Sequence, residues 1–74
     1  MNVEIEKRIG HNLRKIRESK KMTQNEASAK LQLEGCDITR SALAKIEVGQ
    51  RHIYPDEIIL FKQIYNVTYE QIFQ

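Results

Sequence analysis

The sequence has 74 residues, of which 41% are hydrophobic and 30% charged, and this balance is typical of one small soluble domain over residues 1–74. Its net charge of +2 is uneven, because residues 1–54 carry +4 and residues 55–74 carry −2, which favours a polyanionic partner. Composition and pattern exclude a fibrous chain and a membrane-spanning helix, and the single Cys36 excludes an internal disulfide. We expect no signal peptide and a cytoplasmic location.

The first regular pattern predicts a helix over residues 3–20. Four apolar residues recur at the helical period, with Lys and Arg on the other faces: Ile5, Ile9, Leu13 and Ile16. Asn2 is a candidate N-cap, and Glu4 and Glu6 lie where the positive end of the helix dipole favours acids. The helix is therefore expected to bury one apolar face and to leave a mostly basic surface.

A second helix is predicted over residues 24–32. Thr23 is followed three positions later by Glu26, and this spacing is the capping box that begins many helices. The stretch over residues 33–38 then breaks the pattern, since Gly35 is a turn former. We expect a loop between the second and third helices.

The third helix is predicted over residues 40–48. Thr39 is placed as its N-cap, and Leu43 and Ile46 would form its buried face. Gly49 is the type of residue that ends a helix, because it adopts the left-handed conformation without strain. A polar loop follows.

Two more helices complete the chain. Pro55 suits a first helical turn, and Asn66 ends the helix that begins there. Thr68 and Gln71 repeat the capping-box spacing and predict a short helix over residues 69–73. Five helices without any period-two pattern predict an all-α, compact five-helix domain.

Four segments, in this order, are similar to the helix-turn-helix domains of the phage lambda repressor/Cro family, also called the XRE type: Leu13–Arg17, Met22–Ala27, Leu43–Arg51 and Val67–Ile72. The resemblance implies a lambda-repressor-like fold and a transcriptional regulator that binds double-stranded DNA, by analogy a repressor. It further implies a homodimer on a near-palindromic operator, without catalysis and without a cofactor.

The resemblance also implies which residues meet DNA. The third helix would lie in the major groove and read bases with residues near its start: Arg40, Ser41, Ala42 and Lys45. Phosphate contacts would come from the start of the second helix and the ends of the third: Gln24, Thr39, Gln50, Arg51 and His52. Arg17 and Glu47 match a family position pair that forms a partly buried ion pair.

The connection between the two motif helices departs from the family. Leu31 and Ile46 are fifteen residues apart, farther than the family's usual spacing, so the loop over residues 32–38 carries extra residues. Either the loop bulges outward with the docking angle preserved, or the third helix is displaced. Because Glu34 and Asp37 would repel phosphates, we expect the loop to point away from DNA.

Other classes of function remain as alternatives. The same fold serves as a protein-interaction module, such as an antitoxin-like partner, but its third helix would then be expected to carry aromatic or Met anchors. A membrane surface could attract the basic first helix, although its acids disfavour this. His11 and His52 have no acid or thiol at metal-ligand spacing, and no nucleophile motif or Gly-rich phosphate loop is present. We therefore expect no metal site and no enzyme.

The apolar residues near the C-terminus have two readings. They are aromatic or lie off the main apolar face of the fourth helix: Tyr54, Ile59, Leu60, Tyr69 and Phe73. They either close a small core or form an exposed patch for association. The sequence leaves both open.

Overall fold

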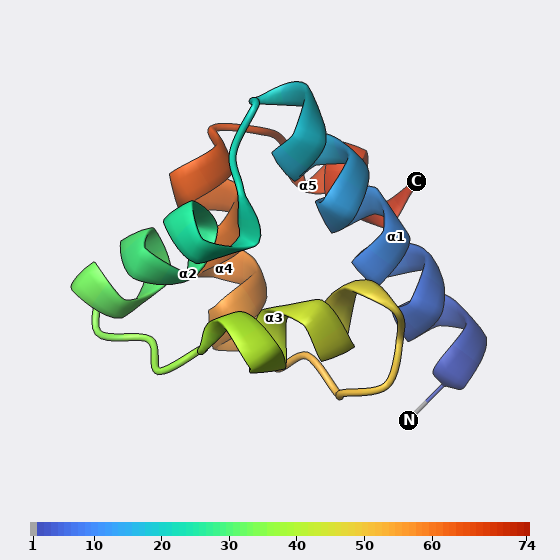
Figure 1. Cartoon of the computed structure of the whole chain (residues 1–74). Coiled ribbons are helices and arrows are strands. Elements are labelled where there is room, and N and C mark those ends of the chain that lie inside the picture. The colour runs from blue at the N-terminus through green and yellow to red at the C-terminus, as the bar shows by residue number, and fades with distance from the viewer. Residues whose placement is uncertain (1) are drawn as a thin grey trace.

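Five α-helices joined by short connections form the computed structural model, which describes residues 2–74 (Figure 1). In chain order they are α1 (Val3–Ser19), α2 (Gln24–Leu33), α3 (Arg40–Glu47), α4 (Pro55–Tyr65) and α5 (Tyr69–Phe73). The predicted all-α class is confirmed, and each predicted helix boundary lies within one residue of the observed one. None of the helices in residues 2–74 is long and apolar enough to cross a membrane.

Side-chain caps explain why the boundaries followed from the sequence. Thr23 and Glu26 form the complete capping box of α2, with reciprocal hydrogen bonds of 3.0 and 2.9 Å. The Thr39 hydroxyl accepts the Ala42 N–H at 3.2 Å and begins α3. Asn66 ends α4 in the left-handed conformation, at φ 54°. These signals are local, so they act wherever the helices pack.

The core lies where α1 packs against α3, α4 and α5, and where α2 packs against α3 and α4. Its largest fully buried side chains come from every helix and from the α2–α3 connection: Leu13, Leu31, Ile38, Leu43, Ile46, Phe61, Tyr65 and Ile72. Burying each such side chain stabilises the fold by about 1.5–3 kcal/mol. Ile5, which was expected on the apolar face of α1, is instead 44% exposed, because this end of α1 projects beyond the other helices (Figure 1).

Gly10 allows α1 and α3 to touch backbone to backbone. It is buried, and a Cβ atom built on it would lie 2.1 Å from the main-chain oxygen of Ile46. Two atoms that are not bonded to each other do not come this close, so any larger residue would push the two helices apart. Gly10 therefore fixes how closely α3 approaches α1.

The longer connection between α2 and α3 is anchored at both ends. Gly35 adopts φ +84°, and the Cys36 N–H donates to the Leu31 carbonyl at 3.0 Å, so the chain turns directly after α2. Ile38 is fully buried, and its carbonyl accepts a hydrogen bond of 2.8 Å from the Ser28 hydroxyl. The extra residues are thus absorbed in a fixed loop while α3 stays packed on α1 and α2.

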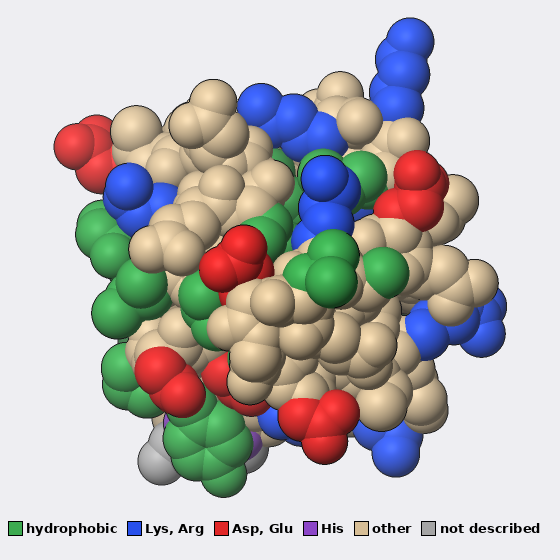
Figure 2. Space-filling view, turned by 90° about the vertical axis from the view of Figure 1, so that its left-hand side faces the viewer, with side chains coloured by type: hydrophobic (Ala, Val, Ile, Leu, Met, Phe, Trp, Pro, Cys, Tyr) green, Lys and Arg blue, Asp and Glu red, His purple; other side chains and the backbone are tan. Residues whose placement is uncertain are grey.

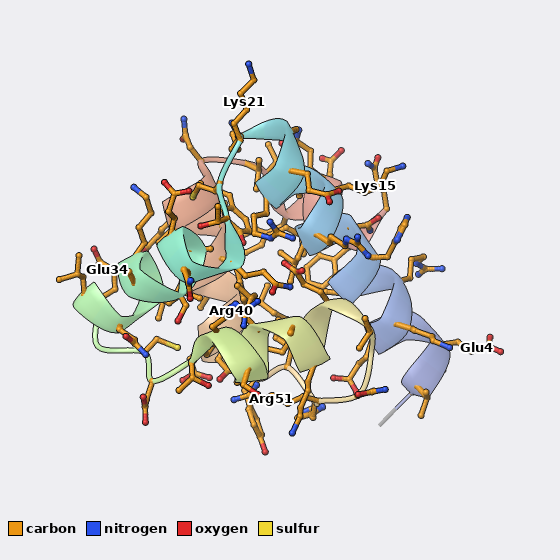
Figure 3. All side chains as sticks on the ribbon, in the orientation of Figure 1. Glu4, Lys15, Lys21, Glu34, Arg40 and Arg51 are labelled. Carbon is orange, nitrogen blue, oxygen red and sulfur yellow. The ribbon has the colours of Figure 1, made fainter. Side chains whose placement is uncertain are left out.

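The acidic residues of this connection lie on the surface. Glu34 and Asp37 are both exposed. Figure 3 places Glu34 at the far end of α2, pointing away from Arg40 at the start of α3. The placement of Glu34 agrees with a loop that faces away from the surface of α3.

Candidate nucleic-acid interface

One face of α3 is open to solvent along its whole length. The buried Leu43, Ile46 and Glu47 share the opposite face. This side carries four exposed residues, with the half-buried Ala44 among them: Arg40, Ser41, Lys45 and Val48. Three of the four predicted base-reading residues therefore lie on the surface together.

Ala42 is the exception among the predicted base-reading residues. It is partly buried and packs against the core, because it precedes Ile46 by four residues and shares its face. Ala44 is also half-buried, but it lines the groove beside Arg40 and Val48, one turn after the first and one turn before the second. The sequence contained this signal, since positions four apart along a helix share a face.

A groove of about 530 Å³ lies between α3, the start of α2 and the second half of α1. Figure 3 shows Arg40 at this groove, between α2 and α3. Its walls are mostly polar and basic: Arg14, Arg17, Thr23, Gln24, Asn25, Arg40, Ala44, Glu47 and Val48. The backbone N–H groups in the first turn of α2 have no intrahelical acceptor, and the helix dipole makes this end positive. The groove is therefore suited to an anion.

Arg17 and Glu47 pair at the floor of this groove. Arg17 Nε and Nη2 donate to the Glu47 carboxylate at 2.8 and 3.1 Å, and Arg17 Nη1 donates to the Met22 carbonyl at 2.8 Å. The two side chains are only 9% and 1% exposed. The hydrogen bond with Glu47 raises the pKa of Arg17 despite its burial, so the guanidinium stays charged. The pairing implied by the resemblance is present.

Comparison with known proteins identifies the family of this arrangement. The sequence matches the helix-turn-helix family model over residues 13–72, which is most of the chain. The chain belongs to the helix-turn-helix family. It is a DNA-binding transcription regulator of the XRE type. Its fold is similar to the crystal structure of the DNA-binding domain of BldD, with a TM-score of 0.84 and 20% identity over 100% of both chains. No curated protein sequence matches the chain.

Gln24 begins the first helix of the helix-turn-helix and is tied to the second. Its side-chain Nε2 donates to Glu47 Oε1 at 3.0 Å, so one carboxylate holds both Arg17 and Gln24. Glu47 consequently links α1, α2 and α3. The Gln24 amide nitrogen is thus engaged within the protein, whereas Gln50, beyond the end of α3, is exposed.

Arg51 lies just after the helix-turn-helix and makes a second ion pair that the sequence did not reveal. Its Nη1 and Nη2 donate to the Glu57 carboxylate at 2.9 and 3.0 Å, and Nη1 also donates to the His52 carbonyl. Burial raises the pKa of Glu57, but hydrogen bonds from Arg51 and the Tyr54 N–H outweigh it and hold that pKa below its ordinary value. No helical spacing relates Arg51 to Glu57, so only the folded loop brings them together.

His52 is partly exposed, and one edge of its ring faces the protein. Its Nδ1 lies 2.6 Å from Glu6 Oε1, and its ring meets Tyr54 edge to face, with ring centres 4.5 Å apart. Glu6 Oε1 also accepts the Ile53 N–H at 2.9 Å. The loop after the helix-turn-helix is thus bound to α1 and α4 through Arg51 and His52, two of the five residues that were predicted to contact phosphate.

Proposed function

We propose that this helix-turn-helix protein reads specific base pairs of double-stranded DNA by placing α3 in the major groove. The observation that carries the proposal is the open face of α3, where Arg40, Ser41 and Lys45 stand together on a helix whose other side is fixed in the core. Arg or Lys can donate to guanine O6 and N7, and Ser can bond to several bases. Ala44 and Val48 replace Ala42 as the methyl groups that could meet thymine.

Phosphate contacts would set the register of α3. We assign them to Gln24, at the first turn of α2, and to Thr39 and Gln50 at the ends of α3. Arg51 and His52 are already held by protein partners, since both Nη atoms of Arg51 bond Glu57 and Nδ1 of His52 lies against Glu6. We therefore assign these two a positioning role, which is to hold the loop after α3.

A homodimer that represses by occupying a promoter is the expected biological form. Ile59, Tyr69 and Phe73 are 43–45% exposed, and the last two rings stack with centres 6.5 Å apart. An exposed apolar surface on α4 and α5 favours association, and a two-fold dimer would require half-sites about one helical turn apart. A soluble domain acting on DNA in this way is expected in the cytoplasm.

A protein partner is the second candidate function, and a different surface favours it. Leu33 is 86% exposed beside a groove of about 300 Å³ between α2 and α4, which Lys30 and Ile64 also line. Figure 2 shows this side of the molecule, where hydrophobic side chains gather along one edge among acidic and basic ones. Such a surface is compatible with a protein and carries no continuous positive charge for DNA.

The test begins with selection of bound duplexes from a random DNA pool, followed by anisotropy titrations on the selected duplex and on a scrambled one. Lys45→Gln is expected to weaken binding to the selected duplex by about 10- to 100-fold and binding to the scrambled one much less, since a good base contact contributes about 1–3 kcal/mol. Lys30→Gln also removes one positive charge, but in the last turn of α2, and is the matched control. Failure to select any sequence, or an unchanged ratio of the two affinities in Lys45→Gln, would contradict the proposal.

A further inference from the structure

A second groove adjoins the first one at the end of α3, beside α1. It encloses about 500 Å³ between α1 and the end of α3, and four of its six lining residues are basic or histidine side chains of α1: Lys7, Arg8, His11, Arg14, Glu47 and Val48. Arg14 and Val48 also line the first groove, so the two grooves meet. This α1 groove is continuous with the open face of α3.

The close contact at Gly10 places these cations beside α3. Lys7 and Arg14 lie three residues before and four residues after Gly10, which puts both on the side of α1 that borders α3. Gly49 allows Lys7 to pack closely on the turn after α3, because a Cβ atom on Gly49 would lie only 2.5 Å from Lys7 Cγ. The methylene stem of Lys7 therefore packs on the α3–α4 turn while its ammonium remains in solvent.

The charge of the α1 groove is not neutralised within the protein. In residues 2–74 no carboxylate lies at ion-pair distance from Lys7 or Arg8. Arg14 Nε is 3.5 Å from Glu18, but both side chains are more than half exposed, and such a pair is weak and easily exchanged. Glu47, the one acid in the groove, is buried and paired with Arg17.

We propose that the α1 groove binds a backbone phosphate of the DNA strand that borders the major groove beside α3, with Lys7 and Arg14 as the two clamping cations. The inference rests on the proposed docking of α3. Phosphates line both edges of the major groove, so a helix lying in it has a strand on each flank. The α1 groove adjoins the first groove at the end of α3, where the two share Arg14, Glu47 and Val48, so it would meet a phosphate of the strand that passes this end of α3.

The salt dependence of binding tests the clamp. In Lys7→Gln/Arg14→Gln, the slope of log affinity against log salt is expected to become shallower by about 0.9, since the clamp neutralises one phosphate and each neutralised phosphate contributes about 0.9. The ratio of affinities for selected and scrambled duplexes should stay unchanged, because phosphate contacts carry no sequence information. Lys21→Gln/Lys30→Gln removes two charges at exposed sites away from α3, and its slope should match that of the wild type.

Two further measurements locate the contact. Lys7→Arg/Arg14→Lys keeps both charges and should keep the wild-type slope. Ethylation of single phosphates in the selected duplex should reveal a position that weakens the wild type but not Lys7→Gln/Arg14→Gln. The single variant Arg14→Gln, with an expected loss of part of this roughly 0.9 in slope, serves if the double variant does not fold.

The outcomes separate this inference from the proposed function. A wild type that selects no DNA sequence overturns both. A wild type that selects a sequence, combined with an unchanged slope in Lys7→Gln/Arg14→Gln, overturns only the clamp and leaves the role of α3 intact. A shallower slope together with the loss of one phosphate from the interference pattern supports the clamp.

Discussion

Arg17 and Glu47 join the last turn of α1 to the last residue of α3 through two buried hydrogen bonds of 2.8 and 3.1 Å. The same carboxylate accepts a bond from Gln24 at the start of α2. Three helices therefore converge on one charged group, and the orientation of α3 relative to α1 and α2 depends on it. If α3 reads DNA as proposed, this network sets the angle at which α3 is presented.

Removing one partner of this pair should be costly. Glu47→Ala leaves the Arg17 charge buried without a counter-charge and is expected to lower the free energy of unfolding by roughly 3–5 kcal/mol. Arg17→Met/Glu47→Leu replaces both charges by apolar side chains and should recover most of the loss. Urea denaturation followed by circular dichroism measures both. Equal destabilisation by the single and double variants would show that the stranded charge is not the cause.

Gly10→Ala should destabilise the protein although alanine is the better helix former. Helix propensity alone predicts a gain of about 1 kcal/mol, but the added Cβ would meet the Ile46 carbonyl, and overpacking of this kind costs up to about 3 kcal/mol. Gly35→Ala is the control, since a Cβ there meets nothing within 4 Å and only the positive φ is strained. Thermal unfolding of both variants decides the matter, and a stabilised Gly10→Ala would refute the backbone contact.

Tyr65→Phe should stabilise the protein. The Tyr65 side chain is 1% exposed, and its hydroxyl has no hydrogen-bond partner in residues 2–74. Deleting an unsatisfied buried hydroxyl is expected to raise the free energy of unfolding at neutral pH by about 1 kcal/mol. Tyr69→Phe, at an exposed tyrosine, should be neutral when both are measured by urea denaturation. A loss of stability in Tyr65→Phe would mean that the hydroxyl has a partner.

Tyr65→Phe should also change how the free energy of unfolding depends on pH in alkaline solution. Burial, with a smaller contribution from Glu47, raises the pKa of Tyr65 above its ordinary value of 10.0. The unfolded chain then loses its tyrosine proton before the folded protein does, so wild-type stability should fall as the pH rises above about 10. Tyr65→Phe should lack this part of the fall, whereas Tyr69→Phe should retain it.

Glu57→Gln should reveal how the second ion pair depends on pH. The pKa of Glu57 lies below its ordinary value of 4.5 because hydrogen bonds from Arg51 and the Tyr54 N–H outweigh burial. The stabilisation is therefore complete above pH 4.5 and is lost as the pH falls through the lower pKa of the folded state. At pH 7 the free energy of unfolding of Glu57→Gln should be lower than that of the wild type. In acid the two free energies should become equal. A constant difference from pH 7 to pH 3 in urea denaturation would contradict this linkage.

The sequence by itself determined the five helices and most of the core. Capping pairs such as Thr23 with Glu26 are local signals, so they specify a boundary whatever the rest of the chain does. The apolar period of each helix identified the buried face at Leu13 and at Leu43. The pair of Arg17 and Glu47 came from the family resemblance, because residues thirty positions apart leave no local mark.

Only the tertiary structure decided which polar side chains remain available to a ligand. Arg51 and His52 had the composition of phosphate contacts, yet the fold places Glu57 and Glu6 against them. Nothing in the sequence distinguishes Lys7 and Arg14 from other surface residues. They line a common groove because the close contact at Gly10 packs α1 against α3. Helix formation depends on neighbours within about four residues, whereas ion pairing and groove formation depend on helix packing, which brings together residues as distant as Glu6 and Ile53.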